Sequence, residues 1–180
     1  LGARARKTRT KSFNAFSSID YPETAMFRDR RLIQFLHRPA EYTHAVFSTA
    51  LDPNVFVLRL VPGMRADIIP MLEGRYRALV LESFGVGGLP GGDDGAMFAA
   101  VRDWCGAGHL AVFTTQVPHE GSDLAVYEVG RAAKALPGVL EAHDMTPEAT
   151  AVKLMWVLGQ TTDRAEAEKL FLTPVQWDIL

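Results

Sequence analysis

Short apolar runs alternate with segments of helical spacing from about Val55 onward. The apolar runs are rich in branched residues and predict buried strands, and the pair Val139-Leu140 predicts a short fourth one. Strands that alternate with helices are typical of βαβ units, so the pattern predicts an α/β fold with a parallel sheet. The three longer predicted strands cover residues 55–61 (VFVLRLV), 77–81 (RALVL) and 109–115 (HLAVFTT).

Apolar residues at helical spacing recur between and after these strands. The start at Thr146 is the clearest, because its hydroxyl can accept a hydrogen bond from an unpaired N–H group, and Pro147 and Glu148 both suit the first turn. The segment 66–72 is short, and Pro70 leaves its end open because proline fits poorly beyond a first turn. The predicted helices cover residues 66–72, 93–106, 124–136, 147–159 and 163–170, with Gly159 ending the fourth and Thr162 beginning the last.

The first fifty residues show no sustained period of either strands or helices. Aromatic residues and prolines interrupt this part of the chain, which predicts connecting structure and not a second core. We therefore expect a compact α/β domain over residues 52–180, preceded over residues 1–51 by the tail of an upstream domain and a linker. The first residue is leucine and not methionine, which fits a fragment or a processed chain.

Composition narrows the possible partners and compartments. The 180 residues include 19 Lys and Arg against 21 Asp and Glu, so the net charge of −2 predicts neither a nucleic acid nor an anionic membrane as partner. Cys105 is the single cysteine, which excludes an internal disulfide and a CxxC motif and favours a reducing, cytoplasmic compartment. Neither a signal peptide nor an apolar run long enough to cross a membrane is visible.

The glycine-rich stretch LESFGVGGLPGG, residues 81–92, raises the question of a phosphate site. A dinucleotide fingerprint would run from Gly85 and Gly87 to a third glycine, but Pro90 occupies that position, and no Gly-Lys dipeptide of a P-loop occurs. The pair Asp93-Asp94, at the predicted helix start, would repel a phosphate. The stretch therefore favours a turn with positive φ angles, although open α/β sheets also bind ligands at this edge.

The histidines predict no metal site, because none of the five is spaced from another as metal ligands are. His119, Ser122 and Asp123 contain the residue types of a hydrolase triad, but triads are assembled across a fold and not within five residues. We interpret this stretch as a loop in which Ser122 or Asp123 caps the following helix, and a ligand-facing role is the alternative.

Five cations cluster near the amino terminus, and they fit either a solvated arm or a site that handles anions. A lysine among cations can become a catalytic base because its pKa falls, yet an exposed arm would have the same composition. The cluster consists of Arg4, Arg6, Lys7, Arg9 and Lys11.

Three segments together resemble one family. VLESFGVGGLP (80–90), EGSDLAVYEVG (120–130) and DMTPEATAVKLMWVLGQT (144–161) are similar to the C-terminal domain of bacterial L-asparaginases, closest to the cytoplasmic type I branch, and VFVLRLVPGM (55–64) resembles the strand that opens this domain. The resemblance implies a Rossmann-like parallel sheet after the end of a larger N-terminal catalytic domain. It also implies no cofactor, and a homodimer or homotetramer whose active site lies between subunits.

The resemblance also assigns roles to individual residues. RKTRTKSFNAF is similar to the family segment that contains a catalytic lysine, which implies that Lys7, nine residues before Phe16, helps to activate a threonine nucleophile. Tyr127 aligns with a tyrosine that approaches the substrate of the neighbouring subunit. Glu82 stands where one type I pattern has an arginine implicated in allosteric control, which implies that asparagine does not activate the enzyme cooperatively.

The family's two threonine motifs, T-G-G-T-I and G-T-D-T, do not occur in these 180 residues. The resemblance therefore covers about the C-terminal half of an enzyme that hydrolyses L-asparagine to aspartate and ammonia, and this chain alone is expected to be incomplete for catalysis. Two alternatives remain open. One is the asparaginase-like subunit of a tRNA-dependent amidotransferase, and the other is a non-catalytic α/β module for binding or oligomerisation.

Overall fold

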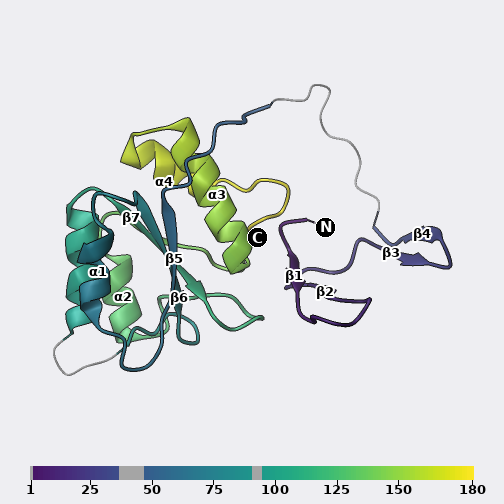
Figure 1. Ribbon diagram of the computed structural model, residues 1–180, viewed down its shortest axis with the longest axis horizontal. Helices are drawn as coiled ribbons and strands as arrows, with labels where there is room; N and C mark the ends of the chain where they lie inside the picture. The colour runs from purple at the N-terminus through teal and green to yellow at the C-terminus, as the bar shows by residue number, and fades with distance from the viewer. Residues whose placement is uncertain (1, 37–46, 91–94) are drawn as a thin grey trace.

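A computed structural model describes residues 2–36, 47–90 and 95–180 (Figure 1). Its centre is a parallel sheet of four strands, whose spatial order follows their order in the chain. The α/β fold with a parallel sheet, expected from the alternating pattern, is confirmed. The strands are β5 (Val55–Arg59), β6 (Ala78–Ser83), β7 (Leu110–Thr115) and β8 (Val139–Glu141).

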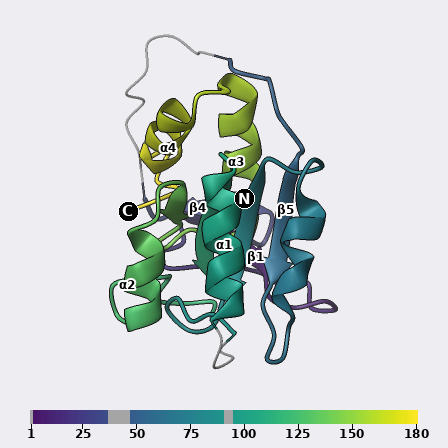
Figure 2. The same cartoon turned by 90° about the vertical axis from the view of Figure 1, so that its left-hand side faces the viewer.

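Helices cover both faces of this sheet (Figures 1 and 2). On one face α1 (Ala96–Gly106) packs against β7 and α2 (Glu128–Lys134) against β8, and on the other face lie α3 (Pro147–Gln160) and α4 (Arg164–Leu172). The central strands β6 and β7 are buried along their whole length, which explains their continuous apolar runs. Two apolar cores result, one on each side of the sheet.

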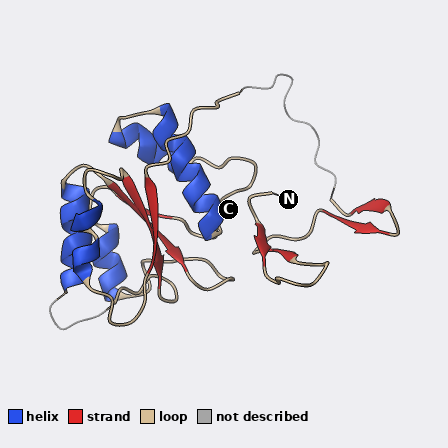
Figure 3. Ribbon diagram, viewed as in Figure 1, coloured by secondary structure: helices blue, strands red, loops and turns tan. Residues whose placement is uncertain are grey.

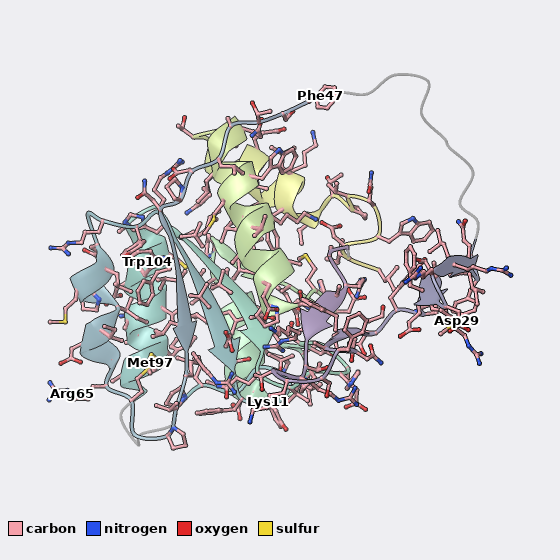
Figure 4. The ribbon with its side chains drawn as sticks, turned by 45° about the vertical axis from the view of Figure 1, so that its right-hand side comes forward. Lys11, Asp29, Phe47, Arg65, Met97 and Trp104 are labelled. Atoms are coloured by element: carbon pink, nitrogen blue, oxygen red, sulfur yellow. The ribbon has the colours of Figure 1, made fainter. Side chains whose placement is uncertain are left out.

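The core on the α1 side is built around Trp104, which is fully buried. Its indole Nε1 donates a hydrogen bond of 2.9 Å to the carbonyl oxygen of Leu110, so the ring packs against the sheet without losing its polar partner. Figure 4 shows Met97 and Trp104 along the same helix. Their helical spacing was the signal that predicted α1.

Several predicted helix bounds were wrong. The segment 66–72 forms two 3₁₀ turns, η1 (Ala66–Ile68) and η2 (Pro70–Leu72), because Pro70 cannot donate the hydrogen bond that would continue the first. Helix α2 begins at Glu128 and not at 124. The cap of α4 is Asp163 and not Thr162, since the Asp163 carboxylate accepts a 2.8 Å hydrogen bond from the Glu166 N–H.

Gly159 does not end α3, which continues through Gln160. A Cβ atom at this position would lie 2.4 Å from the carbonyl oxygen of Ala50, so the glycine allows the chain before β5 to cross close to the helix. Gln160 Nε2 donates to the same oxygen at 2.8 Å. The glycine therefore serves close packing, which the sequence pattern did not distinguish from a helix end.

Residues 1–51, predicted to be the end of an upstream domain and a linker, contain two antiparallel hairpins that the sequence pattern did not indicate (Figure 3). Strand β1 (Ala5–Lys7) pairs with β2 (Phe16–Ser18), and β3 (Ala25–Arg28) pairs with β4 (Arg31–Gln34). The strands are three or four residues long and show no alternation of burial, so they produce no period-2 signal. The second turn has positive φ at Asp29 and Arg30, as in a type I′ turn, without the usual glycine (Figure 4).

The chain enters the α/β domain over the C-terminal end of α3. The Asp52 N–H donates to the carbonyl oxygen of Met155 at 2.9 Å, and the Asp52 carboxylate accepts a 2.8 Å hydrogen bond from Arg77. Arg77 also donates to the carbonyl oxygen of Leu158 at 3.0 Å. Asp52 thus ties the start of β5 to β6 and α3.

This arrangement predicts a pH-dependent contribution to stability. Burial raises the pKa of Asp52, but hydrogen bonds from Arg77 and the Asn54 backbone outweigh it and hold the pKa below its ordinary value. A depressed pKa stabilises the fold above the unfolded-state pKa, and this stabilisation is lost as pH falls through the folded pKa. Urea unfolding of Asp52→Asn and the parent at about pH 6 and about pH 3 is therefore expected to show a stability difference that shrinks at the lower pH. A difference independent of pH would contradict it.

Cys105 lies within the core and is expected to be inert. Burial is the main cause that raises its pKa to about 11, so the reactive thiolate is scarce at neutral pH. A colorimetric thiol reagent should label the native protein very slowly and label it completely after unfolding in guanidinium. Rapid labelling of native protein would show that the thiol is accessible.

Among the described residues, no helix is both long enough and apolar enough to span a bilayer.

Candidate active site

Lys7 is the last residue of β1, exposed and opposite Phe16 in the ladder. The strand that contains it is held beside the N-terminal end of α3. There Arg6 forms a 3.2 Å ion pair with Glu148, and Thr146 Oγ1 donates to the carbonyl oxygen of Ala3 at 3.2 Å. The interpretation of the basic cluster as a solvated arm is therefore wrong for its first residues, up to Arg6, because they are docked on the α/β domain.

The carboxyl ends of the strands are closed by side chains that bond to neighbouring backbone. Gln116 Nε2 donates to the carbonyl oxygens of Leu60 and Glu82, at 2.6 and 2.8 Å, and so joins the ends of β5, β6 and β7. Ser83 Oγ donates to the carbonyl oxygen of Thr114 at 2.7 Å. The Glu82 side chain is nearly buried and pairs with Arg59 at 3.4 Å. These bonds fix the loops that leave this edge.

The glycine loop after β6 is an internally bonded turn. The N–H groups of Gly87 and Gly88 both donate to the carbonyl oxygen of Phe84, and the Phe84 N–H donates back to Gly88. Two of the N–H groups that a phosphate cradle would need are thus occupied, which supports the turn interpretation. Asp93 and Asp94, the other part of that argument, lie outside the described residues.

Leu124 packs closely against two glycines, Gly87 in this turn and Gly130 in α2. A Cβ on Gly87 would lie 2.7 Å from the Leu124 side chain, and a Cβ on Gly130 would lie 2.5 Å from the Leu124 carbonyl oxygen. Leu124 is itself fully buried. The two glycines therefore allow the loop before α2 to enter between the glycine turn and the helix, and the Asp123 N–H adds a 2.7 Å bond to the carbonyl oxygen of Val86.

The Glu141 side chain, at the end of β8, is hydrogen-bonded to the loop before α2. Its Oε1 accepts a 2.7 Å hydrogen bond from the Leu124 N–H, and its Oε2 accepts a 3.0 Å bond from Lys134 Nζ. The Glu141 side chain is 5% exposed, whereas the Lys134 side chain is about half exposed. Glu141 therefore fixes the loop that leads to Tyr127.

Tyr127 precedes α2 and is about half exposed. Figure 1 shows α2 and β1 on opposite sides of the parallel sheet, so the two predicted site residues, Lys7 and Tyr127, are not brought together within one chain. The described residues include no contact between them. This separation fits a site shared between subunits, which stays a prediction.

The residues of the rejected triad are bonded to other partners. His119 Nδ1 lies 3.3 Å from Asp20 Oδ1, and the Ser122 hydroxyl bonds the carbonyl oxygens of Phe113 and His143. Asp123 accepts from the Ala125 N–H and does not cap α2, so the capping role expected for Ser122 or Asp123 was wrong. Over the described part of the chain, no three His, Cys, Asp or Glu side chains gather as metal ligands.

A large open cavity lies between the N-terminal segment and α3. It has a volume of about 1410 Å³ and is lined mainly by the first two hairpins, the outer face of α3 and the segment after α4. Neither Lys7 nor Tyr127 lines it. The lining includes the apolar side chains of Phe13, Phe27, Val152 and Trp156.

The fold and these loops define the class of protein, which is a parallel α/β domain preceded by a short segment of β-hairpins. The family model of the glutaminase/asparaginase C-terminal domain matches residues 54–171. The chain belongs to this family. A curated L-asparaginase from Thermococcus kodakarensis is 39% identical over 172 residues, which are 94% of this chain and 51% of that protein.

Other relatives are named for a different function. A glutamyl-tRNA(Gln) amidotransferase subunit from Metallosphaera sedula is 33% identical over 96% of this chain and 39% of its own length. The chain thus spans about half or less of the curated relatives it matches.

Solved structures of asparaginases superpose on the chain. The thermostable L-asparaginase from Thermococcus kodakarensis gives a TM-score of 0.89 at 36% identity, over all of this chain and 54% of that one. L-asparaginase I from Vibrio cholerae gives 0.81 at 21% identity over 99% of this chain and 54% of its own, which shows the fold alone.

Sequence reasoning missed the residues that hold the site's elements together. Arg4 was grouped with an arm but is buried, and Glu141 was left outside the predicted strand Val139-Leu140, which in the structure extends through Glu141. A charged residue at the end of a predicted strand was the available signal for Glu141. For Arg4 the sequence contained no signal, because its partners lie far along the chain.

Proposed function

We propose that this chain is the C-terminal portion of a cytoplasmic, type I-like L-asparaginase, an amidohydrolase that cleaves the side-chain amide of L-asparagine to aspartate and ammonia. The observation that supports this most is the 39% identity to an L-asparaginase over nearly the whole chain. A threonine outside these 180 residues would attack the side-chain amide carbon, which releases ammonia and leaves an acyl-enzyme ester that water hydrolyses to aspartate. In this proposal residues 1–51 end the catalytic domain and residues 52–180 form the C-terminal domain.

Lys7 would assist the base step. A threonine hydroxyl is a weak nucleophile until a neighbouring base takes its proton, and the exposed amine at the end of β1 is free to face such a residue. Tyr127 would close the pocket of a neighbouring subunit, which requires a homodimer or homotetramer. Glu82, already paired with Arg59, would not provide the arginine of the type I regulatory pattern, so we expect a hyperbolic dependence of rate on asparagine concentration.

A second candidate is the asparaginase-like subunit of a tRNA-dependent amidotransferase. Its support is the 33% identity to two proteins of that name. An additional N-terminal domain in the complete reading frame would favour it, and a reading frame without the threonine motifs would favour a non-catalytic module.

The test is ammonia release by the protein expressed from its complete reading frame. L-Asparagine, L-glutamine and mischarged Glu-tRNA(Gln) with glutamine are compared as substrates. Release from free asparagine, without dependence on tRNA, is expected. Release that requires the mischarged tRNA would assign the second candidate, and release from none of them would leave the non-catalytic module.

A further inference from the structure

Arg4 joins three parts of the chain that are distant in sequence. Its Nε donates to the carbonyl oxygen of Trp177 at 2.9 Å, and its Nη1 donates to the carbonyl oxygen of Asp144 at 2.8 Å. Its Nη2 lies 2.6 Å from Asp144 Oδ2, in an ionic contact whose angle is not that of a hydrogen bond. The residue is 6% exposed. Its guanidinium, one residue before β1, is therefore held in a fixed plane by partners far along the chain.

The partners of Arg4 are themselves tied together. Asp144 Oδ1 accepts a 3.1 Å hydrogen bond from the Leu180 N–H, so one carboxylate contacts both ends of the described chain. We call these four residues, Arg4, Asp144, Trp177 and Leu180, the Arg4 clamp. It joins the start of β1, the loop before α3 and the C-terminal segment.

Strand β1 has few other means of holding its place. It pairs with β2 alone, over three residues, and a two-stranded ladder of this length is marginal by itself. The nearby Arg6 pairs with Glu148, whose side chain is 60% exposed, so this contact adds little. The clamp anchors β1 together with the 3.2 Å bond from Thr146 Oγ1 to the carbonyl oxygen of Ala3. Lys7 follows Arg4 by three residues, about 10 Å along an extended strand.

We propose that Arg4 is a positioning residue for Lys7, acting through the Arg4 clamp. This inference rests on the catalytic role proposed above for Lys7. A lysine amine ends a flexible four-carbon chain, so its distance from the reacting hydroxyl depends on where its backbone is fixed. A displacement of about 1 Å at a reacting group costs on the order of 100-fold in rate. The C-terminal segment thereby helps to set the geometry of the catalytic lysine.

The test is a double-mutant cycle in the complete protein. Arg4→Ala is expected to lower kcat about 10- to 100-fold while KM stays within about threefold, because misplacement affects the chemical step. In the Lys7→Met background the same change is expected to lower the residual kcat by less than about twofold, since no amine remains to be positioned. A purely structural Arg4 would cause the same relative loss in both backgrounds, and that result overturns the inference.

Three further variants distinguish a loss of positioning from a loss of folding. Arg4→Lys and Asp144→Asn keep part of the clamp, and they should show intermediate losses of kcat and the same non-additivity with Lys7→Met. Arg102→Ala removes an exposed arginine of α1 that pairs with Asp103, and it should leave kcat within about twofold. Full activity of Lys7→Met alone would instead refute the proposed role of Lys7, so the two failures are distinguishable.

Discussion

Replacing Lys7 by methionine in the complete protein is expected to lower kcat for asparagine hydrolysis by about 10³-fold. The two side chains have similar length, but the thioether cannot take or return a proton, and a positioned acid or base contributes about 10² to 10⁴ in rate. KM should change by less than about threefold, because the lysine acts on the nucleophile and not on binding. The measurement is coupled ammonia release under saturating asparagine.

Lys11→Met provides the matched control. Lys11 belongs to the same basic cluster and is also exposed, but it lies in the turn between β1 and β2. Its replacement should leave kcat within about twofold, as for most exposed surface positions. A Lys7 variant that keeps full activity beside this control would refute the assignment of the catalytic lysine.

The second large effect concerns the ion pair between Lys153 and Asp178. Lys153 Nζ lies 2.8 Å from Asp178 Oδ2, donates to the carbonyl oxygen of Thr173 and lies 5.6 Å from the centre of the Phe171 ring. Both side chains are less than a tenth exposed. Asp178→Ala leaves the ammonium buried without a counter-charge, and we expect the free energy of unfolding to fall by about 3–5 kcal/mol in urea titrations.

The double variant Lys153→Met with Asp178→Leu distinguishes this cause from simple loss of packing. Buried ion pairs replaced by apolar residues of similar volume are often neutral in stability, so this variant should unfold within about 1 kcal/mol of the parent. Glu168→Ala breaks the more exposed pair with Arg164 on α4 and should cost no more than about 0.5 kcal/mol. Equal losses in Asp178→Ala and the double variant would contradict the argument.

Sequence reasoning was effective where burial is periodic or continuous. The runs that became β6 and β7 were found because strands buried on both faces are apolar throughout. The start of α3 was found because threonine is a favoured helix cap, and Thr146 Oγ1 accepts a 3.2 Å hydrogen bond from the Ala149 N–H. These signals depend only on residues that are close in the sequence, so the sequence alone is enough to predict the elements.

Long-range features were not predictable in the same way. Lys153 lies within the predicted helix 147–159, and the local pattern could not indicate its counter-charge, because that comes from Asp178 near the C-terminus. The role of Gly159 depends on the chain crossing at Ala50, and the first hairpin is held beside α3 by Thr146 and Glu148, which lie far along the chain. The roles of Lys7 and Tyr127 came from the family resemblance, and their test is kinetic.

The clamp has a consequence for the order in which the molecule is built. Arg4 and Trp177 are 173 positions apart, so the contact cannot form until almost the whole described chain has been synthesised. Loop closure over such a distance is slow compared with the pairing of neighbouring strands and helices. During synthesis the segment that contains Lys7 therefore emerges long before the C-terminal residues that complete the Arg4 clamp.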